Sequence, residues 1–227
     1  LSGGRYALFN ESAEDITIDN VDIESSDTAI YINAQNTTLE FISGNIVSTE
    51  GMGISLTHNT NIHITSGTIN SKTNGIYGRC YNSYVTIDTM DITSTNNSAI
   101  AFDTYNSDYN TINISGGTYQ GADYGIVSDS THLHIKDSKV ITTSTNRDRY
   151  AIHGYYYAYL YIDNCIIESP SASGIFIQTD AIITNTSISA GASNGFGIFT
   201  DGGTTIINDG SSITTTGTSS SGIYTRY

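Results

Sequence analysis

Along the whole chain, a small residue followed by an aliphatic residue recurs at a nearly constant interval. The ten pairs begin at Ala7, Ala29, Gly53, Gly75, Ala99, Gly125, Ala151, Gly174, Gly197 and Gly222, and consecutive pairs lie 22 to 26 residues apart. A second phrase, apolar-x-apolar-x-x-small-x-apolar, keeps the same period, for example at 16–23, 62–69 and 160–167. Self-similarity with a fixed period of this length indicates a solenoid.

Each repeat predicts three short strands: one at the small-aliphatic pair, one at the first two apolar residues of the second phrase, and one ending at its last apolar residue. Only two residues separate the second strand from the third, and we expect a sharp corner with left-handed backbone there. The residues that suit this corner are Asn20, Gly116, Asp137, Asn164 and Asn185. Asn36, Asn59 and Asn82 share another register, which predicts a hydrogen-bonded asparagine ladder.

Such coils cannot bury their inner faces alone, but stacked coils share one continuous core, at about 4.8 Å per step. We therefore predict an all-β protein: a single-stranded right-handed parallel β-helix of about ten coils with three short parallel sheets, forming one domain over 1–227. The pattern shows no cap at either end, and open sheet ends invite pairing. The expectation is an excerpt of a longer polypeptide or end-to-end self-association.

The coil phrases resemble those of the pectate-lyase-like superfamily of right-handed β-helices, which includes polysaccharide lyases, polygalacturonase-like hydrolases, phage tailspikes and autotransporter passengers. The resemblance covers nearly the whole chain and implies a polysaccharide groove along the sheet of the small-aliphatic strands. It leaves function open, because these β-helices include enzymes, adhesins and inert stalks. The main rival architecture, a leucine-rich repeat, lacks support because its Leu-rich, Asn-anchored consensus is absent.

Alternation along the small-aliphatic strands points each aliphatic residue inward and predicts two exposed columns on the outer face. The first column is rich in aromatic residues: Phe9, Tyr31, Ser55, Tyr77, Ala101, Val127, His153, Phe176, Phe199 and Tyr224. The second is charged in its middle: Glu11, Asn33, Thr57, Arg79, Asp103, Asp129, Tyr155, Gln178, Asp201 and Arg226. The longest intervals between pairs carry insertions at 103–110 and 141–150, which we expect to flank this sheet.

The two columns yield one candidate ligand-binding site. Its predicted members are Tyr77, Arg79, Asp103, Asp129, His153, Tyr155 and Phe176. Rim residues expected beside them are Tyr105, Tyr109, Arg147, Arg149, Tyr156 and Tyr157. Aromatic side chains suit stacking on sugars, and arginine suits a uronate carboxylate. The alternative interpretation is a solvated polar face on which Arg79 neutralises Asp103.

Asp103 and Asp129 are expected about 5 Å apart on adjacent coils, where one pKa rises. That spacing is near the one for retaining glycoside hydrolysis, and the same pair could instead hold Ca²⁺ through carboxylate oxygens. An enzyme would use Asp103 and Asp129 with Arg79 and His153. However, the sequence lacks the paired-Asp phrases and Arg-Ile-Lys motif of polygalacturonase-like hydrolases and the Arg-x-Pro-x-x-Arg signature of pectate lyases. His153 alone is interpreted as a surface aromatic.

Composition narrows the partners. The chain has 8 Lys and Arg against 22 Asp and Glu, a formal charge of −14, which disfavours nucleic acid and anionic membrane surfaces. No apolar run is long enough to cross a bilayer, so direct membrane insertion is not expected. Two cysteines are too few for a disulfide framework: Cys165 is interpreted as core filler, Cys80 as the start of a turn, and the two as too distant to pair.

We expect a non-catalytic secreted or cell-surface segment, adhesin-like, that binds a polysaccharide or host glycan along the small-aliphatic sheet and needs no cofactor. The first alternative is a polysaccharide lyase or glycoside hydrolase that uses the central carboxylates. The second is a structural stalk or filament unit that binds no glycan. An extracellular or cell-surface location is implied by the family resemblance.

Overall fold

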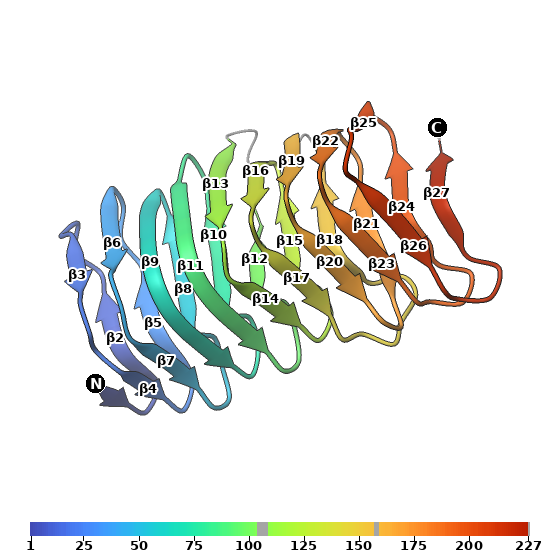
Figure 1. Ribbon diagram of the computed structural model, residues 1–227. Coiled ribbons are helices and arrows are strands. Elements are labelled where there is room, and N and C mark those ends of the chain that lie inside the picture. The colour runs from blue at the N-terminus through green and yellow to red at the C-terminus, as the bar shows by residue number, and fades with distance from the viewer. Residues whose placement is uncertain (104–108, 157–158, 227) are drawn as a thin grey trace.

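The computed structural model describes residues 1–103, 109–156 and 159–226 of the protein. All regular elements in these ranges are β-strands, and every strand pairing is parallel. Successive coils lie side by side from the N-terminus at one end of the molecule to the C-terminus at the other (Figure 1). The protein is thus a parallel β-helix, as the repeat predicts.

One sheet receives one strand from each repeat and contains the small-aliphatic pairs. Its ten strands are β2 (Tyr6–Asn10), β5 (Thr28–Ile32), β8 (Ile54–His58), β10 (Ile76–Cys80), β12 (Ile100–Phe102), β15 (Ile126–Asp129), β18 (Tyr150–Tyr155), β21 (Ser173–Ile177), β24 (Phe196–Asp201) and β27 (Ser221–Arg226). About nine full turns of the chain separate its first strand from its last. We call it the ten-stranded sheet.

The other strands form one seventeen-stranded sheet that covers two faces of the solenoid. One face holds β3 (Ile16–Ile18), β6 (Thr37–Phe41), β13 (Asn110–Ser115), β16 (Thr131–Lys136), β19 (Tyr159–Asp163), β22 (Asp180–Thr184) and β25 (Thr205–Ile207). The other holds β1 (Ser2–Gly3), β4 (Ile23–Ser25), β7 (Asn45–Ser48), β14 (Thr118–Gly121), β17 (Lys139–Thr142), β20 (Ile166–Ser169), β23 (Ser187–Ala190) and β26 (Ser212–Thr215). The long strands β9 (Thr60–Ser71) and β11 (Tyr84–Ser94) run across both faces. The predicted second and third sheets are therefore joined.

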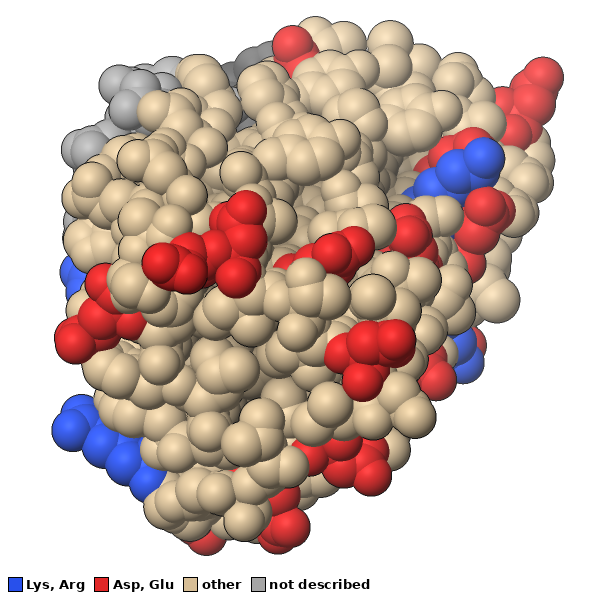
Figure 2. Space-filling model, turned by 90° about the vertical axis from the view of Figure 1, so that its left-hand side faces the viewer, with Lys and Arg blue, Asp and Glu red and all other residues tan. Residues whose placement is uncertain are grey.

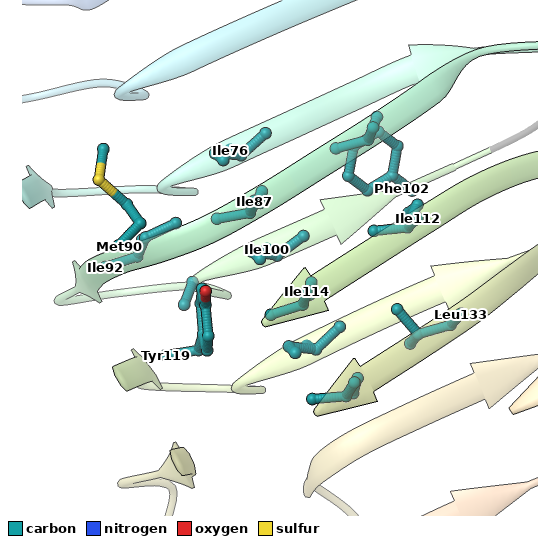
Figure 3. Packing of buried hydrophobic residues seen from close by; sticks show 14 of the residues in the cluster. Ile76, Ile87, Met90, Ile92, Ile100, Phe102, Ile112, Ile114, Tyr119 and Leu133 are labelled. Carbon is teal, nitrogen blue, oxygen red and sulfur yellow. The ribbon is translucent and has the colours of Figure 1, made fainter. Parts of the chain in front are cut away.

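The register follows the sequence repeat. Ile54, Ile76 and Ile100 are direct neighbours on adjacent strands, and all three are fully buried. Figure 3 shows how Ile76 and Ile100 of the ten-stranded sheet face Ile87 and Ile112 of the other sheet across a common interior. Burial of these columns supplies the main driving force for folding, because each coil alone exposes its inner face.

The predicted corners have left-handed backbone. The φ angle is 53° at Asn20, 51° at Asp137, 52° at Asn164, 46° at Asn185 and 79° at Gly116. Asparagine and aspartate tolerate this conformation better than other residues that have a Cβ atom. The period-2 pattern on both sides of a two-residue gap was enough to locate these corners.

Side-chain ladders join neighbouring coils at the corners. The Asn59 amide donates to Asn36 Oδ1 at 3.0 Å, which is one step of the predicted ladder. A further ladder, not singled out from the sequence, runs from Asn185 to Asn164 Oδ1 at 2.9 Å and from Asn164 to Asp137 Oδ1 at 2.6 Å. These bonds connect successive coils outside the core.

Replacing Asn164 by Ala is expected to lower the free energy of unfolding by about 1–2 kcal/mol, because a Cβ-bearing residue without a local polar partner disfavours positive φ. Asn164→Gly should cost less, since glycine adopts this φ without strain. Denaturant unfolding of both variants gives the comparison. An equal loss in the two would assign the effect to the ladder and not to the backbone.

A column of small hydroxyl residues lines a different corner, where the seventeen-stranded sheet turns toward the ten-stranded sheet. Ser25, Ser48, Ser71 and Ser94 are in register and buried. The Ser25 hydroxyl donates to the Gly4 carbonyl at 2.9 Å. These hydroxyl groups satisfy carbonyls of the turns that would otherwise be buried without partners.

Both cysteines are buried free thiols. Cys165 belongs to the core, as predicted. Cys80 is the last residue of β10 and also packs in the core, whereas the sequence analysis placed it at the start of a turn. Burial raises the pKa of each thiol to about 11, so neither is activated as a nucleophile.

The terminal coils expose apolar side chains. Leu1 is 61% exposed at one end, and Ile206 and Ile223 are 47% and 51% exposed at the other. End-to-end association stays a prediction, which light scattering over a range of protein concentrations would test.

Candidate functional site

The outer face of the ten-stranded sheet carries the two columns derived from alternation. Adjacent members of the first column are paired through the whole sheet, for instance Tyr77 with Ala101 and His153 with Phe176. In the second column, Asp129 pairs with Tyr155, and Asp201 with Arg226. Register therefore places the predicted site residues on neighbouring strands β10, β12, β15, β18 and β21 or directly after them.

Tyr77, Arg79, Asp103 and Asp129 are electrostatically coupled. Burial is the largest cause of the raised pKa of Tyr77, which the charge of Asp103 raises further and that of Arg79 lowers. The pKa of Asp129 is raised as well, mainly by burial, and the charge of Asp103 adds to the increase. The Ser130 hydroxyl donates to Asp129 at 3.1 Å and opposes that shift. A raised pKa was expected for one member of the pair, but desolvation outweighs the repulsion that motivated the expectation.

Among the described residues, Asp103 and Asp129 have no third side chain of the kind that would complete a metal site with them. Nowhere in 1–103, 109–156 and 159–226 do three or more His, Cys, Asp or Glu side chains gather as they would around an ion. Asp103 and Asp129 thus lack a third carboxylate there with which to share Ca²⁺, a hard cation that takes six to eight oxygen ligands. Tyr105 and Tyr157, named as rim residues, lie outside the described residues.

His153 and Phe176 are buried, contrary to their expected place in an exposed column. Only 4% of His153 and 8% of Phe176 is accessible. The His153 ring centroid lies 3.8 Å from that of Tyr155, 4.5 Å from Phe176 and 5.1 Å from Tyr124. Alternation correctly directs both side chains away from the core, but neighbouring rings on the outer face then cover them.

The environment of His153 makes it a poor proton-transfer group. Burial, followed by the positive charge of Arg149, lowers its pKa to about 3, so the ring is neutral near pH 7. Its Nδ1 atom is buried and has no hydrogen-bond partner among the described residues. A general base needs both access to its substrate and a pKa near the working pH. The interpretation of His153 as a surface aromatic was wrong, and this geometry also disfavours a catalytic role.

Arg149 lies on the rim as expected but is held by protein groups. Its guanidinium donates to the Tyr124 hydroxyl at 2.5 Å and lies 3.4 Å from the Asp123 carboxylate. It also lies over the Tyr124 ring, 5.0 Å from the centroid. Arg147 pairs with its neighbour Asp148 at 3.4 Å. These contacts engage the two rim arginines, Arg147 and Arg149, with protein groups.

Two tyrosines of the cluster, Tyr124 and Tyr150, were not predicted from the sequence. Each directly precedes a small-aliphatic pair, and strict alternation from the isoleucine assigns it to the inner side. Both rings nevertheless contact the His153 ring, at 5.1 and 5.2 Å. Their place could have been noticed because an aromatic residue recurs there: Tyr6 and Phe196 also directly precede a small-aliphatic pair.

Together these side chains form a continuous aromatic band along the ten-stranded sheet from β15 to β27. Each ring lies within 6.1 Å of at least one other ring of the band, centroid to centroid. Its members are Tyr124, Tyr150, His153, Tyr155, Tyr156, Phe176, Phe196, Phe199 and Tyr224. Tyr156 and Tyr224 are the most accessible, 59% and 43% exposed.

At the first coils, another group of rings is arranged differently. Tyr6, Phe9 and Tyr31 stack nearly parallel, with centroids 5.1 to 5.5 Å apart and interplanar angles of 6° to 14°. Rings stacked in this way cover one another's faces and leave mainly edges to solvent. In the aromatic band, Phe199 meets Phe176 at 85° and Tyr224 at 68°, whereas other pairs stack, such as Phe196 with Tyr224 at 28°.

A polar cleft of about 410 Å³ adjoins the aromatic band where β18, β21 and β24 end. Its lining residues are Tyr156, Gln178, Thr179, Asp180, Asp201 and Gly203. The Gln178 amide donates to Asp201 Oδ2 at 3.3 Å, and its Oε1 atom is buried with no hydrogen-bond partner among the described residues. Leaving such an acceptor unsatisfied costs about 1–3 kcal/mol.

Comparison of the chain with protein-family models, with curated proteins and with solved structures found no match. Membership of the pectate-lyase-like superfamily is therefore a hypothesis that rests on the coil pattern. In the part of the chain that the structure describes, no helix has the length and apolarity needed to cross a membrane.

Proposed function

We propose that this protein is a non-catalytic, carbohydrate-binding β-helix that acts outside the cell or at its surface. The observation that carries the proposal is the aromatic band on the outer face of the ten-stranded sheet, together with the polar cleft at its edge. Aromatic faces flanked by hydrogen-bonding groups suit sugars, which have both apolar ring faces and hydroxyl groups. A rigid row of coils also offers repeated contacts to a repeating polymer.

Charge supports a carbohydrate over other polymers. Asp and Glu side chains are spread over the end of the solenoid that carries the N-terminus, and Lys and Arg are few there (Figure 2). The formal charge of −14 repels nucleic acids and anionic lipid surfaces. Arg149, which lies over Tyr124 at the first coil of the aromatic band, is paired with Asp123 and Tyr124.

A non-catalytic role is supported by the state of His153, which is buried and neutral near pH 7. The competing hydrolase hypothesis has one specific observation in its favour: the raised pKa of Asp129 beside Asp103, which suits a general acid. Incubation with a broad panel of polysaccharides, followed by reducing-end and unsaturated-uronate assays, separates the two. Product formation that disappears in Asp129→Asn would establish the enzyme and overturn our proposal.

Binding is tested with Tyr156→Ala and Tyr155→Ala on a glycan array, followed by calorimetry with the best ligand. Each substitution should weaken binding about tenfold, the effect of losing about 1.4 kcal/mol from an exposed aromatic contact. Tyr84→Ala is the control, because Tyr84 is 53% exposed on the seventeen-stranded sheet, outside the aromatic band.

Equal affinity in the three variants and the parent protein would remove the aromatic band from the binding site. Absence of binding to every glycan would favour the purely structural stalk, in which rigidity alone is the function.

A further inference from the structure

The polar cleft beside Tyr156 has an acidic lining. Asp180 and Asp201 contribute carboxylates, and Tyr156 and Thr179 contribute hydroxyl groups. The orientation of the Gln178 amide is fixed by chemistry, because its NH₂ group faces Asp201 Oδ2 at 3.3 Å, where an amide oxygen would be repelled. The Oε1 atom is shielded from solvent, so the charged acceptors open to a ligand are the carboxylates of Asp180 and Asp201.

Among the described residues, Arg226 is the cation that contacts the lining of this cleft. It is already paired with Asp201. Its Nε donates to Asp201 Oδ1 at 3.0 Å and its Nη2 to Oδ2 at 2.5 Å, a bidentate pair. This pair lowers the pKa of Asp201, so the carboxylate stays ionised. Asp180 is exposed and accepts the Thr204 backbone N–H at 2.7 Å. The two carboxylates and single guanidinium leave the cleft with a net negative charge.

We propose that this cleft is a subsite for an uncharged sugar residue of a neutral glycan. The sugar ring lies on the exposed face of Tyr156, and its hydroxyl groups donate to the carboxylates of Asp180 and Asp201. This inference rests on the proposed function and adds the substrate class. It also reverses the expectation that arginines would select a uronate, because a uronate carboxylate is an acceptor and would meet the net negative charge of this cleft.

The experiment compares neutral oligosaccharides with the uronate forms of the same sugars, which differ only in the oxidation of the C6 hydroxymethyl group. Affinities are measured by calorimetry at low salt, at which surface charges act most strongly. The neutral member of each binding pair should bind at least tenfold more tightly. Asp180→Asn should narrow this preference severalfold, because it removes one repelling charge and keeps the shape of the side chain.

Asp15→Asn is the matched control. Asp15 occupies the same corner position in an early coil, and its Oδ1 likewise accepts a threonine N–H, that of Thr38, at 2.7 Å. This variant removes the same charge from the chain and leaves an amide oxygen to accept the same kind of hydrogen bond, at a site far along the solenoid. It should leave the preference for the neutral sugar unchanged.

The possible results distinguish a failure of carbohydrate binding as such from a failure of the neutral-sugar subsite. If neither member of any pair binds, the proposed function fails and the subsite with it. If the uronates bind as tightly as the neutral sugars or more tightly, carbohydrate binding stands but the subsite is wrong. Calcium titration of the free protein is the remaining check: calcium binding that disappears in Asp180→Asn would assign the acceptors to a cation and overturn the inference.

Discussion

Replacing Phe41 by Ala is expected to lower the free energy of unfolding by about 3–5 kcal/mol, the usual loss for a large buried side chain. Phe41 is fully buried in β6, directly between Ile18 of the coil before and Ile64 of the coil after. The substitution removes a ring that contacts both neighbours and leaves a cavity that the rigid register of three strands cannot close. Denaturant unfolding measures the loss.

The control is Ile166→Ala, which should change the free energy of unfolding by no more than about 0.5 kcal/mol, as is usual for surface positions. Ile166 is 48% exposed in β20. Because solenoids can open locally, hydrogen exchange at the amides of β3, β6 and β9 should accelerate before that of distant coils. Similar losses in the two variants would mean that the Phe41 column is not the packed core described above.

Stability is expected to fall as the pH is lowered from about 6.5 toward 3, and His153 should account for part of this loss. The folded pKa of His153 is lowered to about 3 from an ordinary 6.5. Between these values the unfolded chain binds a proton that the folded protein excludes, so stability is complete above about pH 6.5 and is lost with decreasing pH. The slope from this one group is at most about 1.4 kcal/mol per pH unit.

His153→Phe isolates this contribution, because a phenyl ring suits the aromatic surroundings and cannot titrate. The difference in free energy of unfolding between the parent protein and the variant should shift with decreasing pH in favour of the variant. Carboxylates that titrate in the same range affect both proteins and cancel in the difference. Ile166→Ala, which changes no titratable group, should leave the pH dependence unaltered. Parallel curves for the parent protein and His153→Phe would mean that the folded protein accepts the proton.

The fold could be derived from the sequence because its determinants are local and repeated. The pairs that begin at Gly53, Gly75 and Ala99 fix the period, and strand alternation fixes which side chain points inward. Stacking then places residues of equal phase on neighbouring strands, as observed for Ile54, Ile76 and Ile100. The joining of two predicted sheets through β9 and β11 escaped the pattern, because the alternation shifts phase between Ile64 and Ile69 as it does at the corners where the strand ends.

The candidate site was derived only in part. Register predicted Arg79, Asp103 and Asp129 on successive coils. The charges of Arg79 and Asp103 act on the pKa of Tyr77, and the charge of Asp103 acts on that of Asp129. Burial could not be derived in the same way. Whether His153 is exposed depends on Tyr124 and Tyr150, whose positions alternation assigned to the inside. The polar cleft depends on Asp201 and Arg226 pairing across adjacent coils, which the column order allowed but did not require.

By itself, the sequence determined the coil, its period, its left-handed corners and the direction of each side chain, since these follow from backbone geometry that repeats every turn. Only the tertiary structure decided what lies against each side chain. Gly75 and Ala99 look interchangeable in the repeat, yet a Cβ atom on Gly75 would lie 2.5 Å from the Ala99 carbonyl oxygen and 2.2 Å from an Ile92 methyl group. The physical reason is that direction is a property of one strand, whereas contact, burial and charge pairing depend on the side chains that neighbouring coils bring to the same place.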